Sequence, residues 1–318
     1  MRYCEFGGKK VSVIAMGTSD FGGTCPAAEG MRFMDAYCGL GGNFIDTARC
    51  YGDFAGRRDG ESEKVVGKWM ADRGNRSELF LSTKGGHPRL DDMHTGRLSR
   101  AEILDDLAGS LEDLRTDYVD IYWLHRDDLS RPVGDVMETL TGIVESGRAK
   151  LVGVSNWTAA RIREANAYAA SHGLHPLDAN QPQFSLARQM WVEDDTRVQV
   201  GREDWMMHRE TGMPLVAFSS QAKGFFTKLY AEGLEKLSKK GRERFDYPEN
   251  MAIYERILAL SAETGLSVTA IAMAWVTCQP FPVFAIAGAS RMEHVLSIGE
   301  ICDCTITPEQ RDRLFSYE

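Results

Sequence analysis

Residues 43–51 read NFIDTARCY, a short apolar run that ends in a carboxylate and is followed five residues later by a tyrosine. Two later stretches have the same form: residues 79–84 read LFLSTK, and residues 118–125 read YVDIYWLH. Their length and their aromatic and β-branched content predict three buried strands, which end in a carboxylate, an ammonium and an imidazole. In a barrel of parallel strands, chemistry is done at these C-terminal ends.

Five further apolar runs bring the number of predicted strands to eight. The eight runs are residues 11–17, 43–46, 79–84, 118–124, 151–155, 178–181, 214–218 and 283–287. Helix signals lie between them: Ser99 and Glu102 form a capping box, and Gly173 is placed to end a helix. This alternation predicts one (β/α)8 barrel (a TIM barrel) with parallel strands over residues 1–318.

The predicted barrel carries additional segments at both of its ends. Residues 1–10 are expected to form a hairpin at the barrel floor. The connections at about 86–98, 183–199 and 219–249 are expected to be long loops on the C-terminal face. Loops in that position usually shape a substrate or cofactor site.

Composition excludes several classes of function. A net charge of −9 argues against a broad surface for nucleic acid or an anionic membrane. No apolar run approaches the ~18 residues of a spanning helix, and MRYCEFGGKK at the start has no signal-peptide core. Seven scattered cysteines suit a reducing compartment, so we expect a cytoplasmic protein. Cys302 and Cys304 lack partners at zinc-finger spacing, and we interpret them as structural thiols.

Four side chains at or after the strand ends can together deliver a proton to a carbonyl oxygen. Tyr51 would be the proton donor, because a phenol with a pKa near ~10 is protonated at neutral pH. Lys84 would lower that pKa, and Asp46 would hold the ammonium in place. His125 would hydrogen-bond the carbonyl and fix its angle. This arrangement needs no metal ion.

Each of the four residues also has a simpler interpretation. Asp46 could be a helix cap and Tyr51 an aromatic residue at the rim. Lys84 could be a solvated charge, and His125 a hydrogen-bonded histidine at a strand end. The occurrence of all four after predicted barrel strands favours the catalytic interpretation.

The chain resembles the aldo-keto reductase family, in its bacterial-type NADP(H)-dependent form, through nearly its whole length. The matching segments are MGT (16–18), FGG (21–23), NFIDTA (43–48), YG (51–52), STK (82–84), LHR (124–126) and GVSN (153–156). The resemblance implies a (β/α)8 barrel and a catalytic tetrad of Asp46, Tyr51, Lys84 and His125. It also implies NADP(H) bound in an extended form, without a Rossmann domain and without a metal. Consistently, the sequence contains no G-x-G-x-x-G.

The resemblance also assigns cofactor positions. Ser155, Asn156 and Gln181 would hold the nicotinamide amide, and Phe184 would stack on its ring. The segment after the seventh run would wrap the pyrophosphate, with Lys223 or Lys228 as a counter-charge. The complete expected set is Gly17, Thr18, Asp46, Ser155, Asn156, Gln181, Phe184, Phe218, Ser219, Ser220, Gln221, Lys223, Gly224, Gly288, Ser290, Arg291 and His294.

The adenosine end departs from the family pattern. Ser290 and Arg291 resemble the residues that grip the 2′-phosphate, and His294 stands where the family usually has a glutamine. Ser297 and Ile298 replace the usual Glu-Asn pair that meets the adenine and ribose. NADP(H) is preferred, and NAD(H) remains an alternative.

The expected substrate is a small aldehyde or ketone, with a sugar-like carbonyl as one option. The residues expected at the pocket mouth are Asp20, Phe21, Tyr51, His125, Arg126, Asp127, Trp157 and Trp191. Three alternatives stay open: a redox-sensing NADP(H)-binding module like the potassium-channel β-subunit branch of the family, a Schiff-base lyase that uses Lys84, and a sugar oxidase or isomerase. The sequence identifies no protein partner.

Overall fold

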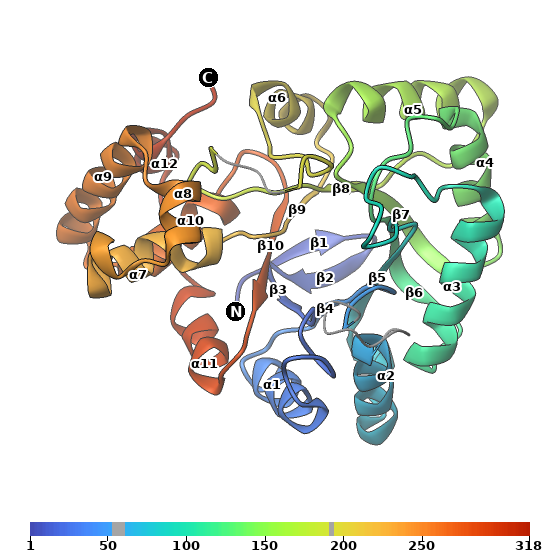
Figure 1. Cartoon of the computed structure of the whole chain (residues 1–318), viewed down its shortest axis with the longest axis horizontal. Helices are drawn as coiled ribbons and strands as arrows, with labels where there is room; N and C mark the ends of the chain where they lie inside the picture. Colours follow the sequence, from blue (N-terminus) through green and yellow to red (C-terminus); the bar gives the residue numbers. More distant parts are fainter. Residues whose placement is uncertain (53–60, 191–193) are drawn as a thin grey trace.

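Eight parallel strands close into a barrel in the computed structural model of the chain, which describes residues 1–52, 61–190 and 194–318 (Figure 1). The strands follow the wall in chain order, and the last strand pairs with the first. They are β3 (Ile14–Gly17), β4 (Phe44–Asp46), β5 (Phe80–Gly85), β6 (Val119–Leu124), β7 (Ala149–Ser155), β8 (Ala179–Gln181), β9 (Leu215–Ala217) and β10 (Val283–Gly288). Each predicted run overlaps one of these strands, so the predicted (β/α)8 barrel is confirmed.

A hairpin of β1 (Tyr3–Phe6) and β2 (Lys9–Ser12) closes the floor of the barrel, as predicted. The ring centroid of Phe6 lies 4.8 Å from that of Phe80 and 4.9 Å from that of Phe284, near the first residues of β5 and β10. The first predicted strand is therefore divided: its initial residues belong to the hairpin, and its last four form β3.

Helices encircle the barrel (Figure 1). They are α1 (Ala27–Gly39), α2 (Glu61–Arg73), α3 (Arg100–Leu114), α4 (Val133–Glu145), α5 (Ala159–His172), α6 (Arg202–Thr211), α7 (Phe225–Glu232), α8 (Lys239–Phe245), α9 (Pro248–Thr264), α10 (Val268–Thr277), α11 (Met292–Ile301) and α12 (Pro308–Leu314). The predicted helix ends are present: Ser99 and Glu102 form the capping box of α3, and Gly173 ends α5 at φ 66°.

The segment 219–249 is not the loop that we expected. It contains a 3-10 turn at Ala222–Gly224 and the helices α7 and α8. Phe225, Phe226 and Leu229 are buried at helical spacing, and this apolar face holds α7 against the body of the protein.

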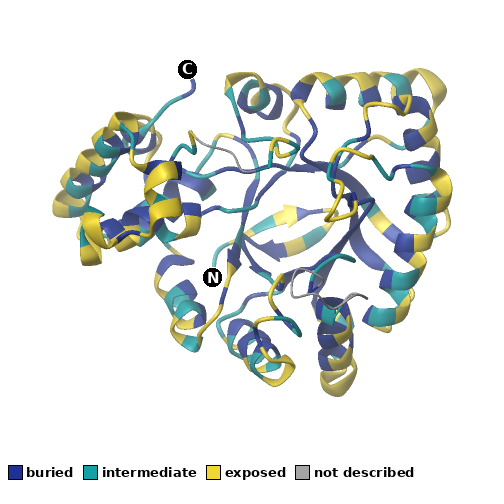
Figure 2. Cartoon of the chain, viewed as in Figure 1, coloured by how far each residue is buried: buried dark blue, intermediate teal, exposed yellow. Residues whose placement is uncertain are grey.

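Apolar side chains form two clusters, one inside the barrel and one between the barrel and the helices. The inner cluster includes Phe6, Phe44, Phe80, Trp123 and Phe284 and fills the floor. The outer cluster covers the inward faces of the helices, whose opposite faces are exposed (Figure 2). The upper part of the barrel interior is left to polar side chains.

Among the described residues, no single helix is long and apolar enough to cross a membrane. The one pair that passes this test together, α9 and α10, is bent by 103° at its break.

Candidate active site

Strand alternation turns three of the four predicted catalytic side chains toward the barrel interior. Side chains two or four residues apart on a strand share one face. Each of the three lies at such a spacing after an aromatic residue of the inner cluster; the pairs are Phe44 and Asp46, Phe80 and Lys84, and Trp123 and His125. The same alternation that fills the floor with aromatic rings thus places a carboxylate, an ammonium and an imidazole above them.

Lys84 is the centre of the hydrogen-bond network above the floor. Its Nζ donates to Asp46 Oδ2 at 2.6 Å, to the carbonyl oxygen of Thr47 at 2.7 Å and to the hydroxyl oxygen of Tyr51 at 3.2 Å. The side chains of Lys84 and Asp46 are each 1% exposed. Neither residue is a solvated charge or a helix cap, and the tyrosine hydroxyl lies within hydrogen-bond reach of a buried ion pair.

The charges around Lys84 keep it an ammonium. Burial alone would lower its pKa, but the carboxylate of Asp46 and the hydroxyl of Tyr51 outweigh burial, and the pKa is raised. Burial also raises the pKa of the Tyr51 phenol, and the lowering by Lys84 does not cancel it. Lys84 does lower the pKa of Tyr51, as expected, but burial of the phenol has the larger effect.

His125 lies across the pocket from Tyr51, with ring centroids 5.7 Å apart. Its backbone N–H donates to the carbonyl oxygen of Gly85 at 2.8 Å, which fixes the end of β6 against β5. Burial lowers the pKa of its imidazole well below the usual value, with further lowering by His87 and Lys84. A neutral imidazole at this position can donate one hydrogen bond into the pocket.

Two neighbours of His125 were absent from the predicted site. The ring of His87 lies edge-on to that of His125 at 4.7 Å, and Cys50 Sγ lies 3.5 Å from Nδ1 of His125. His87 follows Lys84 by three residues, and Cys50 precedes Tyr51 directly. Their closeness to two predicted site residues in the sequence was the available signal.

The predicted amide-binding residues adjoin the ion pair. Gln181 Nε2 donates to Asp46 Oδ1 at 3.0 Å, and Ser155 Oγ donates to the backbone carbonyl of Gln181 at 2.7 Å. Asn156 has a left-handed backbone at φ 62°, and its Nδ2 donates to the carbonyl oxygen of His125 at 3.1 Å. Hydroxyl and amide groups of this kind suit a carboxamide.

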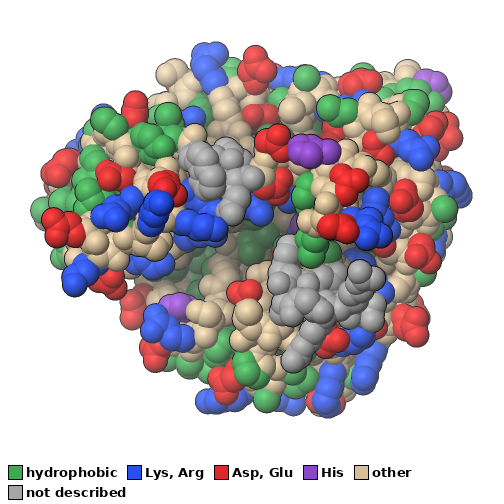
Figure 3. All heavy atoms as spheres, viewed as in Figure 1, with side chains coloured by type: hydrophobic (Ala, Val, Ile, Leu, Met, Phe, Trp, Pro, Cys, Tyr) green, Lys and Arg blue, Asp and Glu red, His purple; other side chains and the backbone are tan. Residues whose placement is uncertain are grey.

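One cavity of about 1040 Å³ extends from these residues to α11. Figure 3 shows this face hollowed near its centre, with basic side chains beside the hollow. Most of the predicted cofactor residues line the cavity: Gly17, Asp46, Ser155, Asn156, Gln181, Phe218, Ser219, Ser220, Gln221, Lys223, Gly224, Gly288, Ser290, Arg291 and His294. The cavity has the volume and the polar groups for a dinucleotide with a substrate at its inner end.

The loop after β9 has a strained backbone where it borders the cavity. Ser219, Ala222 and Lys223 have φ values of 52°, 48° and 57°, a region that side chains with a Cβ rarely adopt. Ser220 Oγ donates to the carbonyl oxygen of Ile286 at 2.7 Å and ties this loop to β10. Such strain persists where the surroundings enforce it and clusters at ligand sites.

Three polar side chains gather at the outer end of the cavity. Arg291 Nη2 lies 3.1 Å from His294 Nε2, and Ser290 Oγ lies 3.4 Å from His294 Nδ1. Partial burial and then the charge of Arg291 lower the pKa of His294. Ile298 belongs to α11, is 2% exposed and lines the cavity. An apolar side chain therefore stands where the family pattern has the amide of an asparagine.

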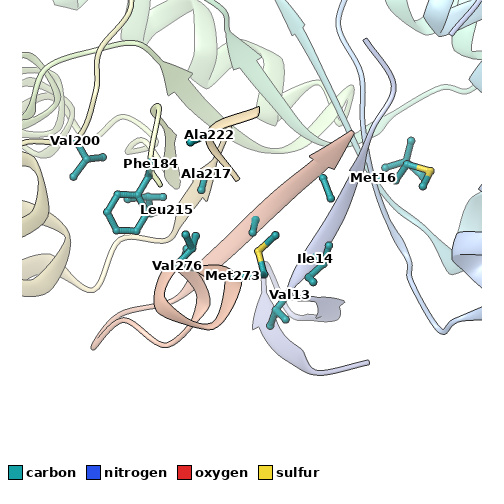
Figure 4. Close-up of a cluster of buried hydrophobic side chains, with 14 of the residues drawn as sticks. Val13, Ile14, Met16, Phe184, Val200, Leu215, Ala217, Ala222, Met273 and Val276 are labelled. Carbon is teal, nitrogen blue, oxygen red and sulfur yellow. The ribbon is translucent and has the colours of Figure 1, made fainter. Parts of the chain in front are cut away.

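The structure does not place Phe184 at the cofactor position. Its ring is 1% exposed and packs 5.0 Å from Trp275, among buried side chains that include Leu215 and Val200 (Figure 4). Phe184 lies beyond the end of β8 and is not among the residues that line the cavity. Phe218, just after β9, does line the cavity.

Three further predicted positions do not line the cavity. Phe21 is fully buried against Phe33, and Trp157 is fully buried, with the Arg161 guanidinium 5.3 Å from its ring centroid. Thr18 Oγ1 instead donates to the backbone carbonyl of Asp46 at 3.2 Å. These three side chains are buried in the wall of the site and do not line the cavity.

Of the remaining residues predicted at the pocket mouth, some line the cavity and others do not. Asp20 and Arg126 line the cavity, and Arg126 forms a 3.1 Å ion pair with Asp194. Asp127 is not among the lining residues and faces Arg161 at 3.4 Å. Trp191 lies outside the described residues.

Comparisons with known proteins agree with this geometry. Residues 13–317 match the model of the Aldo/keto reductase family, and the chain belongs to this family. It is 30% identical to norsolorinic acid reductase B of Dothistroma septosporum, over 90% of this chain and 73% of the relative. It is 29% identical to the aryl-alcohol dehydrogenase GME11368 of Pestalotiopsis microspora, over 94% of this chain and 77% of the relative. A protein of Oryza sativa subsp. japonica named "Probable voltage-gated potassium channel subunit beta" is 28% identical, over 99% of this chain and 95% of the relative. The chain is therefore an oxidoreductase that acts on carbonyl and alcohol groups.

Proposed function

We propose that the protein reduces small aldehydes or ketones with NADP(H), and that Tyr51 is the proton donor. One observation carries the proposal: the Tyr51 hydroxyl lies 3.2 Å from an ammonium that is itself held by a buried carboxylate. These residues lie at one end of a cavity of about 1040 Å³ whose lining extends to α11. A panel of carbonyl and alcohol substrates, followed at the nicotinamide absorbance, tests it; no turnover with any carbonyl would argue against it.

In the proposed mechanism each of these side chains has one role. The nicotinamide cofactor supplies the hydride when bound. Tyr51 donates its proton to the carbonyl oxygen as negative charge develops there, and Lys84 stabilises the phenolate that remains. His125, held neutral by burial, donates a hydrogen bond to the same oxygen and fixes its approach.

For the cofactor we propose Phe218, in place of Phe184, as the aromatic residue beside the nicotinamide. Phe218 lines the cavity at the end of β9, whereas Phe184 does not. Ser155, Asn156 and Gln181 would bind the carboxamide, and the strained loop after β9 would hold the pyrophosphate.

The part of the cavity that we propose for the substrate is lined by both apolar and charged side chains. His87, Leu90 and Met93 line the cavity there, with Arg126 and Arg197 around the single carboxylate of Asp194. The names of two relatives make aryl alcohols with their aldehydes, and norsolorinic acid, the first compounds to test.

Two alternatives remain distinguishable. The Schiff-base lyase requires a neutral Lys84 amine, which its raised pKa disfavours, and the absence of borohydride trapping would remove that alternative. The sensor alternative draws on the name of the rice relative, and NADPH fluorescence quenching with very slow turnover would support it. A cytoplasmic location is also a proposal, and seven free thiols support it.

Reduction is expected to keep a constant kcat/KM from about pH 6 to about pH 9. The raised pKa keeps Tyr51 protonated as the pH rises toward about 10, the usual phenol value, and the lowered pKa keeps His125 neutral as the pH falls through about 6.5. Alcohol oxidation, which needs the phenolate, should instead increase as the pH rises. A pH profile of both directions measures this, and a midpoint near pH 7 for reduction would contradict it.

Arg291→Ala is expected to weaken NADPH binding about tenfold and to leave NADH binding nearly unchanged. Only NADPH carries the 2′-phosphate, and a charge-assisted bond contributes roughly 1.5–3 kcal/mol. The Arg291 side chain is 70% exposed, so solvent screening favours the lower end of that range. Fluorescence titration of both cofactors measures it, with the exposed Arg32→Ala as control. Equal losses for NADPH and NADH would place the phosphate elsewhere.

Dialysis of the enzyme against a chelator is expected to leave reduction unchanged, because the proposed proton donor and hydride donor need no metal ion. The assay compares kcat before and after dialysis, with and without added Mg²⁺ or Zn²⁺. Activity that is lost and then restored by either ion would argue for a different mechanism.

A further inference from the structure

A cysteine and two histidines meet beside the tetrad. Sγ of Cys50 and one ring nitrogen each of His87 and His125 all lie within 4.8 Å of one another. Within residues 1–52, 61–190 and 194–318, no other three His, Cys, Asp or Glu side chains come together in this way. Both histidines line the cavity, and Cys50 is half-buried next to Tyr51.

The spacing is close to that of a tetrahedral soft-metal site. Zinc binds sulfur at about 2.3 Å and imidazole nitrogen at about 2.0–2.1 Å, so neighbouring ligand atoms lie roughly 3.3–3.6 Å apart. Cys50 Sγ and His125 Nδ1 already lie 3.5 Å apart. The three ligand atoms lie within 4.8 Å of one another, so small side-chain rotations would bring them to one ion.

The hydrogen bonding of His87 orients it as a ligand. Its Nδ1 donates to the carbonyl oxygen of Pro88 at 2.7 Å, so in the neutral ring the lone pair lies on Nε2. A backbone carbonyl on the second ring nitrogen is the usual support of a metal-binding histidine.

We propose that Cys50, His87 and His125 bind one soft divalent cation such as Zn²⁺, with a fourth position open to the cavity. Cys50 releases its thiol proton to solvent on binding and coordinates as the thiolate. Of the four tetrad residues only His125 belongs to this site; the loop after β5 supplies His87, and Cys50 directly precedes Tyr51.

The bound ion would inhibit the enzyme, and this part of the inference rests on the proposed function. His87 and His125 both line the cavity, so an ion held between them would occupy space that the carbonyl substrate needs beside Tyr51. Lys84 and Arg126 act on His125 as positive charges, so they weaken cation binding. The thiolate of Cys50 offsets them and restricts the site to metals that prefer sulfur.

Titration of the purified full-length protein with Co²⁺ and with Zn²⁺ tests the site without any activity assay. We expect one ion per chain, a cobalt–thiolate absorption band, and one proton released. Cys50→Ser and His87→Gln should each weaken binding by at least about tenfold. Cys304→Ser, a half-buried thiol outside the cluster, should bind like the wild type. Thermal unfolding of each variant shows that it is folded, and equal binding by wild type and Cys50→Ser would overturn the site.

Inhibition is measured separately. Zn²⁺ should inhibit reduction by the wild type reversibly and in competition with the carbonyl substrate, and Cys50→Ser should lose most of this sensitivity relative to its own activity without metal. Bound zinc that leaves reduction unchanged would overturn the inhibitory role. A protein that gives the cobalt band but reduces no carbonyl would refute the proposed function and leave the metal site standing.

Discussion

Tyr51→Phe is expected to lower kcat for carbonyl reduction by about 10²–10⁴-fold, the usual contribution of a general acid. The substitution removes only the hydroxyl that lies 3.2 Å from Lys84 Nζ. The ring stays, and the amide-binding residues and the outer phosphate site are untouched. NADPH binding should therefore remain near the wild-type value.

The measurement pairs steady-state reduction with fluorescence titration of NADPH. Tyr122→Phe is the matched control, since its hydroxyl is also buried but donates to the carbonyl oxygen of Ile103 on the outside of β6. It should lose some stability and keep its turnover. Reduction by Tyr51→Phe at a rate near that of Tyr122→Phe would discard the phenol as proton donor.

Lys84→Met is expected to abolish most reduction and to destabilise the fold by roughly 3–5 kcal/mol. Methionine has a similar shape, but it leaves Asp46 as a buried carboxylate without its cation, and removal of one partner of a buried pair costs about this much. Ser82 Oγ at 2.7 Å and Gln181 Nε2 at 3.0 Å still donate to Asp46, which favours the lower end of the range.

A second substitution separates the two effects. Asp46→Asn in the Lys84→Met background removes the unpaired charge, so chemical denaturation should show recovered stability. Reduction should stay lost, because no ammonium remains to stabilise the phenolate of Tyr51. Recovery of both properties would mean that Lys84 acts only through the fold.

The barrel and its inner chemistry could be predicted because both follow from local rules. Two-residue alternation determines which side chains enter the barrel, and it places Asp46 and Lys84 at adjacent strand ends. The eight apolar runs and the helix caps are equally local. No tertiary information was needed to expect these positions.

The errors arose where the chain leaves its strands. Phe184 was assigned to the cofactor by order along the chain, but its side chain points into the cluster around Trp275. The helix α7 was not predicted, because its short apolar face lies in a segment rich in lysine and glycine, which is typical of a loop. His87 lies two residues beyond the end of β5, where the alternation of the strand no longer applies, so only its closeness to Lys84 in the sequence pointed to the site.

The division between strand ends and loops has an evolutionary consequence. Asp46, Lys84 and His125 are anchored at the ends of barrel strands, whereas His87, Leu90 and Arg197 come from two surface connections. Mutation can change those two connections while the barrel keeps the carboxylate, the ammonium and the imidazole in place. Exchange of these two loops with those of a relative would therefore transfer the substrate preference of that relative. New substrate preferences could evolve in this way while the residues at the strand ends stay unchanged.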